Sequence, residues 1–189
     1  MVEVVALSFT CNWSLSQQDF AKGMAWIPEI KAGLAQFGKK IEKHYRITFY
    51  YLIAYLLFLN RRYDQALEWN NLMLNDPNED VVKEIFYFAR ILNLLLHYEL
   101  GNHSLLASLL VSTPKYLKAR RPLYATEKTL LRLLGRLLNS VDKAEKQALF
   151  TQFQGDLHQL FQDPKEKRLF NYLDLRVWVG KAFFLQKRI

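Results

Sequence analysis

The chain contains little cysteine, proline or glycine. Its 189 residues include 1 cysteine, 5 prolines and 7 glycines. The single cysteine, Cys11, excludes an internal disulfide framework and favours a reducing compartment, so we expect a cytoplasmic protein. With 51% hydrophobic and 23% charged residues, the composition also excludes a collagen-like fibre, a low-complexity linker and a disordered tail.

Strand and membrane signals are also missing. The sequence has no Asn-Gly or Asp-Gly hairpin turn and no sustained alternation of apolar and polar residues. Its most apolar run, residues 49–59, would form a helix of about 16 Å, half of what spans a bilayer. We therefore predict a buried core helix there and no membrane span. The N-terminus lacks a signal-peptide pattern and leaves open whether the chain is a piece of a longer protein.

Helix signals run along the whole chain, because helix-forming residues fill the long segments and apolar residues recur at spacings of three and four. Turn and capping residues predict about eight helices, near residues 16–38, 41–59, 63–75, 77–100, 103–111, 122–138, 142–161 and 164–187. The short loops between them make successive helices antiparallel neighbours. The sequence therefore predicts a single all-α domain over residues 1–189, built as stacked hairpins or an irregular bundle.

Capping patterns mark several of these helix starts. The segments 76–79 and 163–166 both read Asp-Pro-x-Glu, in which Asp caps the helix, Pro takes the first position and Glu reaches back to the capping amide. Asp142 with Glu145 is predicted to cap a further helix. Pro28 and the pair 113–114 each predict a kink or a restart.

Residues 50–78 carry the pattern of a repeated helical hairpin. Its characteristic positions are Tyr50, Ile53, Ala54, Leu57, Tyr63, Ala66 and the closing Asp76-Pro77-Asn78. This pattern resembles the tetratricopeptide repeat (TPR), in which small residues such as Ala54 and Ala66 let two antiparallel helices approach closely. The sequence departs from the family at Arg61-Arg62, where Gly-Asp is usual, and the stretch 63–77 is one residue short.

A weaker second copy follows over residues 90–120. His103 lies 40 residues after Tyr63, whereas TPR units repeat at about 34 residues, and Leu106 replaces the small alanine. Residues 122–189 do not match the repeat and are expected to close the stack. The chain as a whole resembles degenerate helical-repeat regions of bacterial TPR-like proteins, which implies a short right-handed solenoid.

That resemblance implies a non-enzymatic scaffold that presents a concave surface to a protein or peptide whose identity the sequence does not give. Consecutive aromatic residues, such as those at 49–51 and 86–88, cannot all lie on one helix face, so some are expected to line a ligand groove unless neighbouring repeats bury them. The residues expected on the inner surface are Tyr51, Tyr55, Phe58, Tyr87, Arg90 and Asn93.

Basic residues outnumber acidic ones by 26 to 18, and the excess lies in the second half of the chain. Residues 1–80 have a net charge of −1, whereas residues 81–189 have +9. The densest basic block is Lys115, Lys118, Arg120, Arg121, Lys128, Arg132 and Arg136, opposed locally only by Glu127. This block predicts either a solvated surface or, as an alternative function, a site for nucleic acid or another anionic surface.

Patterns of catalytic or metal-binding residues are missing from the sequence. The four histidines, His44, His97, His103 and His158, have no metal-ligand spacing. Cys11 has no histidine base nearby in the sequence, and no phosphate loop, dinucleotide fingerprint or nucleophile elbow occurs. We therefore predict a protein that is not an enzyme and has no metal or cofactor.

Overall fold

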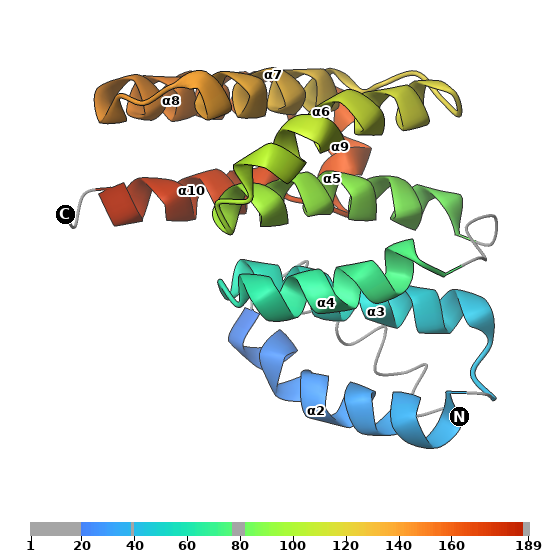
Figure 1. Ribbon diagram of the computed structural model, residues 1–189. Helices are drawn as coiled ribbons and strands as arrows, with labels where there is room; N and C mark the ends of the chain where they lie inside the picture. The colour runs from blue at the N-terminus through green and yellow to red at the C-terminus, as the bar shows by residue number, and fades with distance from the viewer. Residues whose placement is uncertain (1–19, 39, 77–81, 187–189) are drawn as a thin grey trace. The chain divides into compact units, whose positions relative to one another are not determined.

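The structure is a computed structural model that describes residues 20–38, 40–76 and 82–186. These residues form helices and contain no strand (Figure 1), which confirms the predicted all-α class for this part of the chain. The helices are α2 (Phe20–Phe37), α3 (Lys43–Leu59), α4 (Tyr63–Leu74), α5 (Lys83–Glu99), α6 (His103–Lys118), α7 (Ala125–Asn139), α8 (Lys143–Leu160), α9 (Pro164–Phe170) and α10 (Leu175–Gln186).

The described ranges contain nine helices, whereas about eight were predicted. The difference arises because the last predicted helix, 164–187, is divided into two helices, α9 and α10. The Asp174 carboxylate accepts a hydrogen bond from the backbone N–H of Arg176 at 3.0 Å and thereby caps α10. The prediction of one continuous helix over 164–187 was therefore wrong. Neither Pro28 nor Pro114 ends a helix, since α2 and α6 continue through them.

Three predicted features fall wholly or partly outside the described residues. They are Cys11, the helix start expected near residue 16 and the Asp-Pro-Asn-Glu start at 76–79. The predicted cap at Asp142 is confirmed, since its carboxylate accepts the backbone N–H of Glu145 at 2.9 Å. At the other Asp-Pro-x-Glu start, Asp163 accepts the N–H of Lys165 at 2.8 Å, but Glu166 bonds elsewhere.

The chain divides into two compact units, residues 1–96 and residues 97–189. In the first unit, α2 and α4 both pack against α3. Residues 51–59 are all buried, so α3 has no solvent face over this stretch. A helix that is apolar all round must be enclosed by its neighbours. The apolar run at 49–59 is therefore a core helix, as predicted.

The turns after α3 and α5 have the same geometry, 40 residues apart. Arg61 and Gly101 both adopt a left-handed backbone, with φ of 61° and 70°. After each, the next N–H reaches back five residues: Arg62 to the Leu57 carbonyl and Asn102 to the His97 carbonyl, both at 2.9 Å. Both helices therefore end in a Schellman motif, which favours glycine at the left-handed position.

In the second unit, α7 packs against both α6 and α8, and α8 also packs against α10. Leucines of α7 at positions 130, 133, 134 and 137 are buried. An aromatic cluster of Tyr98, Phe150, Phe153 and Trp178 joins α8 to α10, with ring centroids 5.6 to 6.4 Å apart. The Trp178 indole N–H donates to the Glu99 carboxylate at 2.6 Å, so the one polar atom of this buried ring is satisfied.

Candidate functional site

The residues expected to line a concave surface lie in the first unit, and nearly all of them are buried. Their exposed fractions are 3% for Tyr51, 5% for Tyr55, 3% for Phe58, 7% for Tyr87 and 8% for Asn93. Tyr51 and Tyr55 stack on each other at 6.1 Å. The sixth residue, Arg90, is half-buried and has an interaction of its own. These positions therefore do not form an accessible groove, because their side chains fill the space around α3 and α5.

Asn93, one of these predicted residues, belongs to a buried pair of asparagines whose other member, Asn70, was not predicted. Asn70 of α4 donates from Nδ2 to the Ala89 carbonyl at 3.1 Å and to Asn93 Oδ1 at 3.4 Å. Asn70 is fully buried, and such a pair fixes the register of one helix against the next. The only sign of this pair in the sequence is that each asparagine occupies a position at which the pattern of its helix has apolar residues.

Two of the seven predicted basic residues stabilise the second unit. Arg121 forms a bidentate ion pair with Glu127, at 2.6 and 2.9 Å, and Glu127 is only 1% exposed. Arg120 donates to the Tyr116 carbonyl at 3.2 Å, and its guanidinium lies 3.7 Å from the centre of the Tyr116 ring. Arg121 covers the Tyr124 ring in the same way, at 4.7 Å. These two arginines therefore support the loop between α6 and α7.

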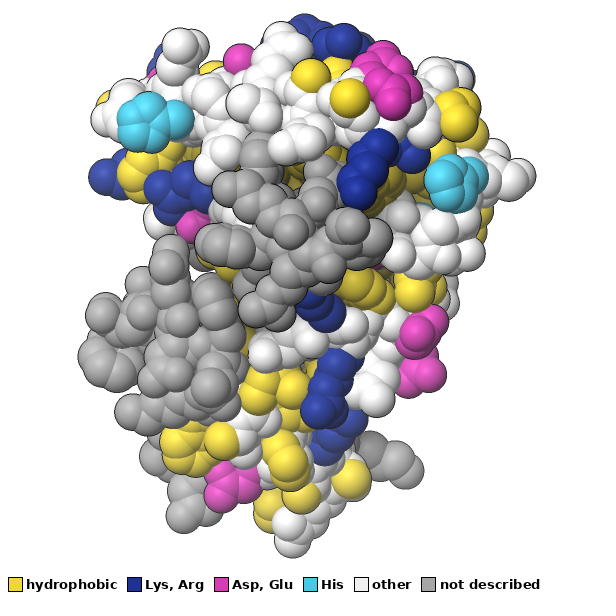
Figure 2. Space-filling view, turned by 90° about the vertical axis from the view of Figure 1, so that its left-hand side faces the viewer, with side chains coloured by type: hydrophobic (Ala, Val, Ile, Leu, Met, Phe, Trp, Pro, Cys, Tyr) yellow, Lys and Arg dark blue, Asp and Glu magenta, His cyan; other side chains and the backbone are white. Residues whose placement is uncertain are grey.

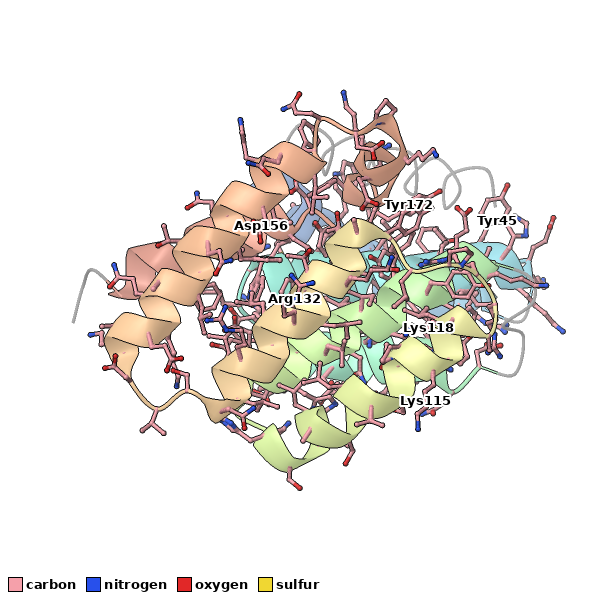
Figure 3. The ribbon with its side chains drawn as sticks, turned by 90° about the horizontal axis from the view of Figure 1, so that it is seen from above. Tyr45, Lys115, Lys118, Arg132, Asp156 and Tyr172 are labelled. Carbon is pink, nitrogen blue, oxygen red and sulfur yellow. The ribbon has the colours of Figure 1, made fainter. Side chains whose placement is uncertain are left out.

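The other five basic residues are exposed and form what we call the cationic face: Lys115, Lys118, Lys128, Arg132 and Arg136. The first two lie near the end of α6 and the other three along α7, which lies between α6 and α8 (Figure 3). A rise of 1.5 Å per residue places successive cations of α7 about 6 Å apart on one side of the helix. By contrast, the face shown in Figure 2 mixes basic, acidic, apolar and uncharged side chains.

The whole net charge of the chain belongs to the second unit. Residues 97–189 contain 16 basic and 8 acidic residues, whereas residues 1–96 contain 10 of each. Among the described residues, the side chains of four members of the cationic face have no hydrogen bond or ion pair, and the Arg136 side chain donates only to Gln152, at 3.4 Å. The positive charge of this face is therefore not paired locally.

All carboxylates of the second unit except that of Asp156 bind other partners, most of them uncharged donors. Glu166 of α9 is 6% exposed and accepts three hydrogen bonds at the start of α7: from the N–H groups of Ala125 and Thr126 at 2.8 and 3.0 Å, and from the Thr126 hydroxyl at 2.7 Å. The predicted return of Glu166 to its own helix cap is thus wrong. A carboxylate fits here because the first amides of a helix lack partners within it.

Two titratable groups at the end of α5 are perturbed by burial. Burial lowers the pKa of His97 below its ordinary value of 6.5, and Asn102 Nδ2 lies 3.1 Å from His97 Nδ1, within hydrogen-bond distance. Burial and the negative charge of Glu99 raise the pKa of Tyr98 to about 12. Both effects favour neutral side chains inside a packed cluster, which is a structural arrangement rather than an acid–base pair.

Three further observations bear on function. Within the described ranges, no group of three or more His, Cys, Asp or Glu is placed to hold a metal ion. None of the helices in those ranges is long and apolar enough to cross a membrane. Comparisons with protein-family models, curated proteins and solved structures found no match.

Proposed function

We propose that this chain is a non-enzymatic helical binding module and that its ligand is an anionic partner held by the cationic face. The observation that carries the proposal is the exposure of five cations without ion pairs on α6 and α7, while the Asp and Glu of the same unit other than Asp156 bind backbone amides, hydroxyls and other partners. Aligned like charges destabilise a helix slightly, so an anion bound between them would stabilise this side of α7.

We also propose that residues 43–118 form two TPR-like hairpin units within a short right-handed stack. The support comes from the two Schellman turns 40 residues apart and from the full burial of Ala54 and Ala66, the small residues of the first hairpin. A TPR-like fold favours a protein partner, and an acidic protein segment fits the cationic face of this chain. Binding of an acidic protein segment is therefore the second candidate function.

Salt-dependent retention on an immobilised polyanion such as heparin tests the proposal. A variant with Lys128, Arg132 and Arg136 changed to Glu loses three cations of the face, whereas its control changes Lys40, Lys143 and Lys165, which are also exposed, to Glu. Both variants undergo the same change of net charge. We expect the first to elute at much lower salt than the second, because contact pairing depends on position as well as on total charge. Equal elution of the two variants, with unchanged helicity, would contradict the proposal.

A further inference from the structure

A shallow groove between α7 and α8 adjoins the cationic face. It is lined by Thr129, Arg132, Leu133, Arg136, Leu149, Gln152, Phe153 and Asp156. Leu133, Leu149 and Phe153 are buried and form its floor, whereas Arg132, Arg136 and Gln152 are exposed and form its rim. The groove holds a volume of about 20 Å³, which is room for about one water-sized group. It is therefore too small for a nucleobase or an amino-acid side chain, but it admits an oxygen atom of an anion.

The two arginines of the rim are positioned to share one anion. They stand four residues apart on α7, so their side chains leave the same side of the helix. Arg136 Nη1 already points to Gln152 Oε1 across the groove at 3.4 Å, and the Arg132 guanidinium has no hydrogen bond among the described residues. A guanidinium presents paired N–H groups whose geometry matches two oxygens of a phosphate.

We propose that this groove seats one backbone phosphate of a nucleic acid, an inference that rests on the proposed function of the cationic face. Lys128 lies one turn before Arg132 on α7, and Lys115 and Lys118 lie beyond it on α6 (Figure 3). These cations extend the positive charge over more than one phosphate. Non-specific nucleic-acid binding derives its affinity from such phosphate contacts.

The surroundings of the groove favour contact with the backbone rather than with the bases. Single-stranded nucleic acids are usually held by stacking of bases on exposed aromatic rings. Tyr116 and Tyr124, which flank the cationic face in the sequence, are half-buried, and each has an arginine guanidinium over its ring. The binding is therefore expected to be independent of sequence and to weaken steeply with salt.

Asp156 gives this groove a signature that a general basic surface lacks. Its carboxylate is half-buried on the α8 side of the groove, and it has no hydrogen bond or ion pair among the described residues. It faces the same space as Arg132 (Figure 3). A phosphate in the groove experiences repulsion from this carboxylate, so Asp156 reduces the affinity. Its replacement by asparagine keeps the shape, removes the charge and is expected to strengthen binding.

The test measures fluorescence anisotropy of short labelled RNA and DNA of two unrelated sequences, titrated with the full chain at about 50 and 200 mM salt. The double variant Arg132→Gln with Arg136→Gln is compared with Lys143→Gln with Lys165→Gln, which removes the same charge. We expect the first to weaken binding about tenfold or more and to lower the salt slope by about 0.7 to 0.9, the contribution of one phosphate, and the second to change binding less than threefold. Asp156→Asn is expected to tighten binding severalfold compared with Asp64→Asn, an exposed control in the first unit.

The outcomes separate this inference from the proposed function. If nucleic acid binds but the arginine pair and Asp156→Asn behave like their controls, the groove is not the phosphate seat, and the cationic face still stands as a general polyanion site. If the chain binds polyglutamate or vesicles with anionic lipid but not nucleic acid, the inference is overturned and the proposed function survives with another partner. If the chain binds none of these polyanions at low salt, both fail.

Discussion

Glu166→Gln is expected to destabilise the second unit strongly, although it changes a single carboxylate oxygen to an amide nitrogen. In the native structure, both carboxylate oxygens face donors at the start of α7: Oε1 accepts the N–H of Ala125, and Oε2 accepts the N–H and the hydroxyl of Thr126. The glutamine side chain offers one accepting oxygen only. Its NH₂ group must face a donor, so one buried N–H or the hydroxyl loses its partner.

The magnitude follows from two losses. A hydrogen bond to a charged group contributes about 1.5–3 kcal/mol, and at least one of the three is lost in the variant. The attraction between a carboxylate and a helix N-terminus contributes about 0.3–2 kcal/mol, with the upper end applying to buried geometry such as that of Glu166, which is 6% exposed. Together these give a decrease of about 2–5 kcal/mol in the free energy of unfolding.

Urea denaturation followed by far-ultraviolet circular dichroism measures this change. Glu68→Gln is the matched control, since Glu68 is exposed on α4 and has no hydrogen bond or ion pair among the described residues. The control is expected to stay within about 0.5 kcal/mol of the native chain. If Glu166→Gln also stays within that range, the carboxylate does not hold α9 to the start of α7 as the structure indicates.

Three further predictions concern particular side chains. Burial lowers the pKa of His97 in the folded state, so the unfolded state binds the proton more tightly. The free energy of unfolding is therefore unaffected by this group above about pH 6.5 and decreases as the pH falls below that value. Replacing His97 by Gln is expected to flatten this part of the pH profile of unfolding, and an unchanged profile would assign the pH dependence to other groups. At the left-handed turn positions, Arg61→Gly is expected to raise the free energy of unfolding by about 0.5–1 kcal/mol, and Gly101→Ala is expected to lower it by about 1 kcal/mol. If both substitutions change the free energy of unfolding in the same direction, the two turns do not share this geometry. Ala66→Trp is expected to lower the thermal midpoint by several degrees, because Ala66 of α4 is fully buried and a larger side chain overpacks its surroundings. An unchanged midpoint would show that the packing around Ala66 is not close.

The features that the sequence predicted are local ones. The cap of α8 by Asp142 involves residues three apart, and the turn after α3 is complete within residues 57–62. The break before α10, which was not predicted, is also local, because Asp174 caps α10 by accepting the N–H of Arg176. The segment before α10, Asn-Tyr-Leu-Asp, contains neither glycine nor proline and therefore carries little turn signal. Helix boundaries can thus be read from short patterns only where the capping residues are distinctive.

The predicted concave surface shows where periodicity gives no information. Because α3 is apolar on every side, its sequence cannot say which face is covered, and the structure buries the whole of 51–59. The partners of Glu166 could not be predicted from the sequence either, because they lie 40 and 41 residues away along the chain. The basic block was visible in the sequence, but its division into Arg121, which pairs with Glu127, and exposed cations depends on how the loop between α6 and α7 folds.

The charge asymmetry of the second unit follows from how its helices begin. The helices α7 to α10 each start at a carboxylate that accepts a backbone N–H: Glu166 for α7, Asp142 for α8, Asp163 for α9 and Asp174 for α10. Helix starts favour negative charge, so folding fixes half of the eight acidic residues of the unit at these ends. Basic residues are favoured at the opposite helix ends, and Lys115 and Lys118 lie in the last turn of α6 and Arg136 in the last turn of α7. The same rule that builds the helices therefore places most carboxylates of this unit away from the cationic face, where solvent ions or the proposed anionic partner supply the counter-charge.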